Sequence, residues 1–192
     1  MRTIQFRYQD PLDVIWLSVA QRLGMTVHRS ADVYASWDGR GNLTIGADET
    51  LDADDCLAQM IFHEICHAVT EGPQSVALPD WGLQMDGTGQ LVREFACLRI
   101  QAALTEPHGL RQMLASTTDF RSYYDRLPLD PLQPDGDPAT EIALTAWNSA
   151  GNHPWMAMTQ QGLRLTAEIA GLVCPLADST SLWRTFRATS TP

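Results

Sequence analysis

The feature that most constrains this chain is the run His63-Glu64-Ile65-Cys66-His67. Residues four apart on an α-helix lie one turn above each other on the same face, so His63 and His67 can hold one metal ion. Glu64 is rotated only modestly from His67 around the helix axis. It can therefore reach a water on that metal without being a ligand itself. This pattern is typical of zinc hydrolases in which the Glu is the general base.

The residues around the motif predict the helix that carries it. Its packing stripe is Leu57, Met60, Ile61, Ile65 and Ala68, at the spacing of an amphipathic helix. We expect Thr50 or Asp52 to cap its start and Gly72-Pro73 to end it.

The sequence before the motif predicts one helix and a small sheet. Asp10-Pro11 opens the helix, which Gly24 ends. A short strand is expected over 25–29. A β-hairpin is expected from 33–37 and 42–46, because Asp38-Gly39-Arg40-Gly41 between them is a strong turn signal.

The sequence after the motif predicts an irregular loop and then mainly helices. The loop runs over 72–89, and a third helix follows over 90–105. Helical segments are expected from Leu110 onward, from Asp137-Pro138 and from Pro154. The acidic, Pro-punctuated stretch Leu127–Pro138 is the candidate exposed loop or linker.

The expected fold class is α+β, with a small antiparallel or mixed sheet packed on the motif helix and a mainly helical C-terminal half. At 192 residues the chain fits one domain. We divide it into a catalytic core over 1–107 and a helical extension over 108–192.

Catalytic zinc needs a third protein ligand, and Glu94 is the preferred candidate. Its helical neighbours three before and four after are Leu91 and Leu98. A Glu on an apolar helix face is costly unless it is paired or metal-bound. Arg93 and Arg99 are expected on the outer face instead.

Other residues stay open as ligands or supporting groups. The alternative third ligands are Asp80, Asp86, Cys97, His108 and His153. Asp80 and Asp86 could also orient a ligand His from behind. His153 is the candidate donor to a developing oxyanion, and Tyr123 and Tyr124 are further candidates for that role. Cys66 and Cys97 are expected to border the metal or to pack as buried thiols.

The motif order also resembles a known family. Phe62-His63-Glu64-Ile65-Cys66-His67-Ala68, followed by Arg93-Glu94-Phe95-Ala96-Cys97-Leu98 and Thr105-Glu106-Pro107, looks like the ImmA/IrrE-type metallopeptidases of gluzincin type. The resemblance covers residues 30–107. Cys66 and Cys97 depart from it, because the family usually has Gly or Ala at the first position and Ala at the second.

The resemblance implies a zincin-like fold and Zn²⁺ held by His63, His67 and Glu94, with Glu64 as base. It also implies that the strand before the motif helix, Leu43–Gly46, runs along the cleft edge and pairs with an extended peptide by β-augmentation. The expected activity is therefore hydrolysis of a peptide bond in a protein or peptide substrate. The alternative is an inactive or regulatory zincin-like protein whose metal is structural or binds a partner.

Composition narrows the partners and the compartment. The net charge of −10 argues against nucleic acid or an anionic membrane as the main partner. All thirteen basic residues are Arg. No run is as long as a membrane span, and no apolar segment follows the charged start Met1–Arg7. We therefore expect a cytoplasmic protein, and the sequence does not indicate its oligomeric state.

Overall fold

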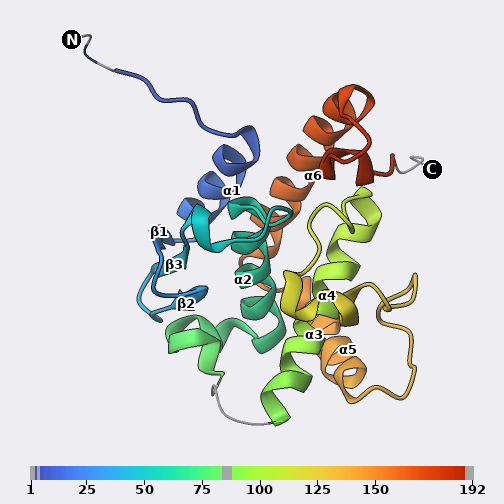
Figure 1. The fold of residues 1–192 in the computed structure, drawn as a ribbon. Coiled ribbons are helices and arrows are strands. Elements are labelled where there is room, and N and C mark those ends of the chain that lie inside the picture. Colours follow the sequence, from blue (N-terminus) through green and yellow to red (C-terminus); the bar gives the residue numbers. More distant parts are fainter. Residues whose placement is uncertain (1–2, 4, 84–87, 189–192) are drawn as a thin grey trace.

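A computed structural model describes residues 3, 5–83 and 88–188 of the chain. Asp86, one of the candidate ligands, lies outside these residues. The main elements, in chain order, are α1 (Pro11–Arg22), β1 (Thr26–Ser30), β2 (Ala35–Trp37), β3 (Asn42–Gly46), α2 (Leu57–Glu71), α3 (Thr88–Thr105), α4 (Thr118–Tyr124), α5 (Pro138–Ala150) and α6 (Met156–Val173) (Figure 1). The fold is α+β, with a small mixed sheet and a mostly helical second half, as the sequence indicated.

The sheet has the order β1-β3-β2. β2 and β3 form the expected antiparallel hairpin, in which Ser36 faces Thr44. β1 pairs with β3 in parallel, and Val27 faces Leu43. The expectation that Leu43–Gly46 lies at a cleft edge and accepts a peptide strand is therefore wrong. β3 is the central strand, and both of its edges already carry ladder hydrogen bonds.

The N-cap of α1 is the residue that the sequence predicted, whereas the N-cap of α2 is a different one. The Asp10 side chain accepts a hydrogen bond from the Leu12 N–H at 2.8 Å, so it caps α1 as expected. The cap of α2 is Cys56, and not Thr50 or Asp52. Cys56 and Gln59 form a reciprocal capping box, in which the Cys56 sulfur accepts from the Gln59 N–H at 3.4 Å and the Gln59 side chain accepts from the Cys56 N–H at 3.3 Å. The expectation failed because the chain first makes a separate 3₁₀ turn over Asp48–Thr50.

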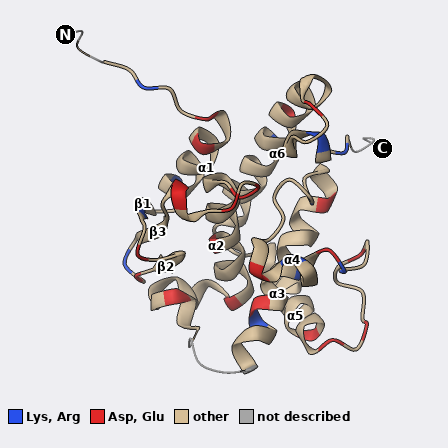
Figure 2. Cartoon of the chain, in the orientation of Figure 1, with Lys and Arg blue, Asp and Glu red and all other residues tan. Residues whose placement is uncertain are grey.

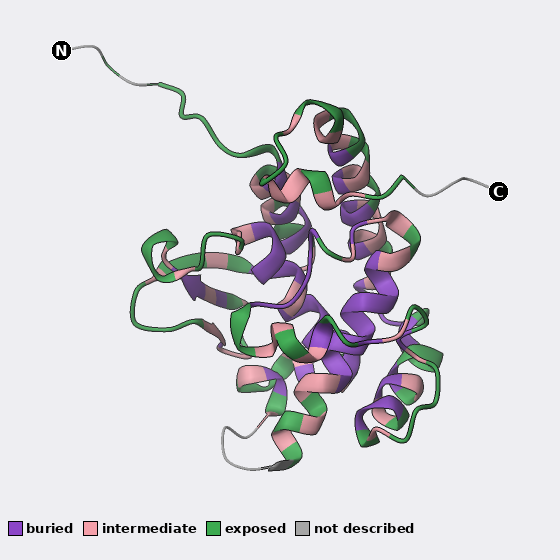
Figure 3. Ribbon diagram, turned by 45° about the vertical axis from the view of Figure 1, so that its right-hand side comes forward, coloured by how far each residue is buried: buried purple, intermediate pink, exposed green. Residues whose placement is uncertain are grey.

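The motif helix α2 is the centre of the core. It packs against α1, α3, α5 and β3, and twelve of its fifteen residues are buried (Figure 3). Trp16 of α1 is fully buried and its indole N–H donates to the Thr166 hydroxyl of α6 at 3.0 Å. The helices that follow residue 107 thus share the core that positions the motif.

Two further expectations in the second half are wrong. Arg99 does not lie on the outer face but is 2% exposed. Its guanidinium donates to the Pro131 carbonyl at 2.7 Å and pairs with Asp135 at 2.6 Å and Asp137 at 3.2 Å. The 127–138 loop is therefore tied to α3, because α3 presents the Arg to it.

The segment from Leu110 to Leu114 forms turns rather than a helix. Gly109, just before this segment, ends the 3₁₀ turn Glu106–His108 with a left-handed φ of 66°. A Cβ there would lie 1.6 Å from the Arg187 carbonyl oxygen, so the C-terminal segment packs directly on this turn. None of the helices in the described part of the chain is both long and apolar enough to span a bilayer.

Candidate metal centre

Two packed helices bring the predicted ligands together. His63 and His67 lie one turn apart on α2, and Glu94 faces them from α3. The two Nε2 atoms of the histidines are 3.1 Å apart. Glu94 Oε1 lies 3.4 Å from His63 Nε2, and Glu94 Oε2 lies 3.2 Å from His67 Nε2. The three side chains are only 7–14% exposed.

These separations fit a tetrahedral zinc site. Ligand atoms at zinc-to-nitrogen or zinc-to-oxygen distances of about 2.0–2.1 Å lie about 3.3 Å from one another. The observed separations are 3.1, 3.2 and 3.4 Å. Glu94 Oε1 is also buried without a hydrogen-bond partner among the described residues. An unpartnered buried carboxylate oxygen is costly, and a cation between the three side chains would satisfy it.

Gln101, which the sequence analysis did not single out, fixes the orientation of His63. Its side-chain N–H₂ donates to the Leu114 carbonyl at 2.8 Å, so its Oε1 must be the atom 2.9 Å from His63 Nδ1. His63 Nδ1 therefore carries the proton and donates to Gln101. The lone pair of Nε2 then faces the centre, which is how supporting residues prepare a His for a metal.

Electrostatics hold a proton at the centre when no cation is there. Burial alone lowers the pKa of His67, but the charge and hydrogen bond of Glu94 outweigh it and raise that pKa to about 9. Burial alone raises the pKa of Glu94, but the charges of His67 and His63 lower it to about 2. The metal-free centre is thus an imidazolium–carboxylate pair, and a cation must displace that proton.

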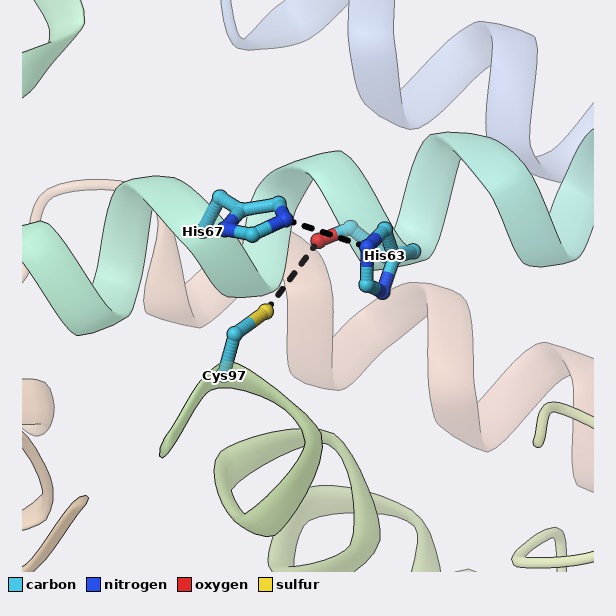
Figure 4. Close-up of side chains that lie close together, drawn as sticks. All are labelled: His63, His67 and Cys97. Carbon is cyan, nitrogen blue, oxygen red and sulfur yellow. Dashed lines mark hydrogen bonds between the residues drawn. The ribbon is translucent and has the colours of Figure 1, made fainter. Parts of the chain in front are cut away.

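Cys97 lies beside the same ligands. One ring nitrogen from each of His63 and His67 and the Cys97 Sγ lie within 4.8 Å of one another (Figure 4). The thiol donates a weak hydrogen bond to the His63 carbonyl at 3.9 Å. Burial raises the pKa of Cys97, and nearby Cys66, which is also fully buried, adds to the rise. Glu94, Cys97 and Gln101 recur at helical spacing, so one face of α3 supplies all three groups.

Glu64, the predicted base, is held by a residue from the loop after α2. It is 6% exposed, and its Oε2 accepts a hydrogen bond from the Trp81 indole N–H at 2.7 Å. Trp81 stacks on Trp37 of β2, with ring centroids 4.7 Å apart and planes 4° apart. The carboxylate is therefore clamped at one oxygen by a rigid aromatic pair.

The backbone that presents Trp81 is strained. Asp80 and Trp81 both have left-handed φ values, 43° and 60°, which are rare for residues other than Gly. The Asp80 carboxylate accepts from the Trp37 N–H at 3.0 Å and from the Ser36 hydroxyl at 3.2 Å. Asp80 is thus neither a ligand nor the partner of a ligand His. It anchors the turn to β2, and non-Gly left-handed residues persist where such contacts over-determine them.

The two remaining histidine candidates, His153 and His108, make contacts with residues other than the candidate ligands. His153 is 5% exposed, its Nδ1 accepts from the Trp155 N–H at 3.2 Å, and its Nε2 has no hydrogen-bond partner among the described residues. Burial lowers its pKa. Its link to Glu64 is indirect, since Trp155 meets Trp81 edge to face at 5.9 Å. His108 bonds Gln160 of α6 at 3.0 Å, so it belongs to another contact.

The hydroxyls of the two tyrosines bond groups other than the candidate ligands. Tyr123 bonds Asp137 and Arg99, at 2.7 and 2.8 Å. Tyr124 is fully buried and donates to the Arg111 carbonyl at 3.0 Å. Neither contact places a hydroxyl at the ligand cluster, so the oxyanion role is not supported for them.

Comparison with known proteins adds no family to these observations. The chain matches no protein-family model, no curated protein and no solved structure.

Proposed function

We propose that this chain is a zinc-dependent hydrolase that cleaves a peptide bond, with His63, His67 and Glu94 as ligands and Glu64 as general base. The observation that carries the proposal is the convergence of three donor groups, 7–14% exposed, at 3.1–3.4 Å, with the neighbouring Glu64 held separately by Trp81. A protein with a purely structural zinc site needs no such carboxylate beside the ligands.

The chemistry divides between the ion and the chain. Zinc, when bound, supplies a Lewis acid that lowers the pKa of water towards neutrality and polarises a carbonyl. Glu64 would take a proton from water at the carboxylate oxygen that Trp81 leaves free, because the Trp81 indole N–H occupies Oε2 and fixes the group in place. Glu64 can then return the proton to the leaving amine. Gln101 keeps His63 in the tautomer that presents Nε2.

The family and fold belong to the same proposal. We place the chain with the gluzincin-type metallopeptidases, on the likeness of its motif helix and Glu-bearing helix to the ImmA/IrrE type. The peptide would not bind along β3, which is the central strand. The substrate is a protein or peptide, because that is the substrate class of the enzymes that the motif resembles.

Metal analysis and one substitution test the proposal. Purified chain should carry close to one zinc per molecule by mass spectrometry, and His67→Ala should lose most of it. Glu64→Gln should keep the zinc and lose hydrolysis of peptides from a proteome-derived library. Zinc unchanged in His67→Ala would refute the site. A wild type that carries zinc yet cleaves no peptide would refute the peptidase activity alone.

A regulatory zincin-like protein is the second candidate, and Cys97 is the observation that favours it. A fourth protein donor would close the coordination shell, as in structural zinc sites. Substitution of the metal by Co²⁺ separates the two readings. A thiolate-to-cobalt charge-transfer band that disappears in Cys97→Ser would support the closed site. Absence of that band, with Glu94→Gln weakening Co²⁺ binding, would support the open, catalytic one.

A further inference from the structure

A groove separate from the metal centre lies where the start of α1 meets the 48–57 segment and the C-terminal turn. Its volume is about 350 Å³, at the low end for ligand pockets and enough for one or two side chains. The floor is apolar and is formed by Leu12, Leu51, Cys56, Leu57, Met113, Leu182 and Trp183. We call it the acidic groove because of the residues that complete its lining.

Those residues are five aspartates, with no Arg among the lining side chains: Asp10, Asp13, Asp48, Asp52 and Asp55. Asp48 pairs with Arg29 at 2.7 Å. Asp55 accepts from the Tyr34 hydroxyl at 3.0 Å. The pKa of Asp13 is raised by its burial and then by the charge of Asp10. The groove therefore combines an apolar floor with an excess of negative charge, as the red segments at α1 and at 48–55 show (Figure 2). A cationic, apolar segment would complement it.

The chain carries such a segment just before α1. Residues 5–9 extend away from the rest of the fold (Figures 1 and 3), and Phe6 and Tyr8 are each 89% exposed. These two aromatic side chains alternate with Arg7, and none of residues 5–9 is acidic. We call residues 5–9 the arm, which is locally positive in a chain of net charge −10. Two almost fully exposed aromatic residues, separated only by Arg7, indicate a contact surface.

The arm leaves α1 in an extended conformation and points away from the rest of the fold (Figures 1 and 3). Asp10 has extended backbone angles, φ −62° and ψ 134°, and Pro11 follows it. A residue before proline strongly prefers this conformation, so the chain stays extended at Asp10. Asp10 itself lines the acidic groove. In a two-fold dimer that brings two rims together, each arm would leave one groove and pass into the other.

We infer that the arm of one copy docks in the acidic groove of a second copy, so that two chains exchange arms in a symmetric dimer. Phe6 and Tyr8 cover the apolar floor, and Arg7 meets the aspartates of the rim. Such an interface is isologous, because both copies use the same two surfaces. Its small area and exposed charges predict a dimer that depends on concentration and weakens as salt is raised. The inference does not rest on the metal centre.

The oligomeric state of full-length variants tests the docking. Sedimentation of wild type from about 1 to 500 μM should show a monomer–dimer equilibrium. Arg7→Glu and Phe6→Ser/Tyr8→Ser should shift its midpoint at least tenfold higher. Matched controls at residues outside the groove lining are Arg164→Glu and Leu129→Ser, at residues 58% and 79% exposed, and they should dimerise like wild type. A wild type that stays monomeric, or arm variants that dimerise unchanged, would overturn the inference.

A disulfide identifies the occupant of the groove. Cys56 lies on the floor, so Tyr8→Cys should form a disulfide with it under mild oxidation. A band of dimer mass on a non-reducing gel, absent in Tyr8→Cys/Cys56→Ser, is the expected result. A disulfide within a single chain would show that the arm occupies its own groove and overturn the exchange. No disulfide under conditions that oxidise exposed thiols would overturn docking altogether.

Discussion

The hydrogen bond from His63 to Gln101 is the contact that sets the orientation of His63 in the candidate metal centre. Gln101 is fully buried, and its own orientation is fixed by the Leu114 carbonyl. We predict that Gln101→Met, which keeps the volume but removes the acceptor, weakens zinc binding about 10–100-fold. Competition with a chromophoric chelator measures this affinity. Folding should be retained, since Met is a tolerant core residue.

A matched pair elsewhere provides the control for this prediction. Gln160 bonds His108 at 3.0 Å in a contact unrelated to the metal centre. Gln160→Met should therefore leave zinc affinity unchanged. If the two variants bind zinc equally well, the orienting role of Gln101 is refuted.

Trp81 supports the proposed base rather than the metal. Loss of a hydrogen bond to a charged group costs about 1.5–3 kcal/mol, so Trp81→Phe should lower kcat about 10–100-fold if the bond is made in the transition state. Zinc content should not change. Trp37→Phe is the control, because that indole bonds the Val76 carbonyl at 2.9 Å instead of Glu64. An equal loss of kcat in both variants would assign the effect to the aromatic stack.

The residues of the centre differ in how far the sequence could reveal them. His63, Glu64 and His67 were proposed from spacing alone. Glu94 was proposed from the cost of a carboxylate on an apolar helix face, although of the two neighbours that defined this face only Leu98 is buried and Leu91 is 46% exposed. Gln101 could also have been predicted from the sequence, because it lies seven residues after Glu94 on the same helix face. Trp81 was not, since its contact depends on two left-handed residues that the Asp80 side chain anchors to β2. Such a conformation is set by tertiary contacts that no spacing pattern encodes.

The same division applies to helices and strands. The hairpin was predicted because its turn signal is local, and the order β1-β3-β2 was not, because it needs a parallel pairing between separate segments. The predicted start of α2 was wrong because Cys is not among the residues that are expected to cap a helix. Cys56 takes the role through its reciprocal bond with Gln59, whose side chain also reaches the Ala115 carbonyl.

Arg99 shows how α3 holds the long loop that the sequence indicated as a linker. Its guanidinium bonds Tyr123 as well as the 127–138 loop, while the aspartates it pairs with are only part-buried. Arg99→Met should lower the free energy of unfolding by about 2–4 kcal/mol, below the full cost of breaking a buried ion pair. It should also open this loop to proteases. Chemical denaturation and limited proteolysis measure the two effects.

A surface pair gives the comparison for Arg99. Arg164 pairs with Glu168 one turn away on α6, and both are 58% exposed. Arg164→Met should change stability by less than about 0.5 kcal/mol. If Arg99→Met also changes the free energy of unfolding by less than about 0.5 kcal/mol, the 127–138 loop does not depend on its contact with α3.

The metal-free protein should show a distinctive dependence of stability on pH. The pKa of Glu94 falls from 4.5 to about 2 on folding, so its contribution is present above pH 4.5 and lost as pH falls through 2. The pKa of His67 rises from 6.5 to about 9, so its contribution is present below pH 6.5 and lost as pH rises through 9. Both describe one ion pair, which therefore stabilises the fold most between pH 4.5 and 6.5.

Thermal unfolding of chelator-treated protein tests this dependence against Glu94→Gln. The difference in stability between the two should reach at most about 3 kcal/mol in that window and shrink on both sides. Zinc should reverse the alkaline slope, because rising pH removes the proton with which the ion competes. The gain in Tm from added zinc should thus grow between pH 6.5 and 9 in wild type and be small in Glu94→Gln. A constant difference across pH, with and without zinc, would show that Glu94 and His67 do not share the proton that the metal must displace.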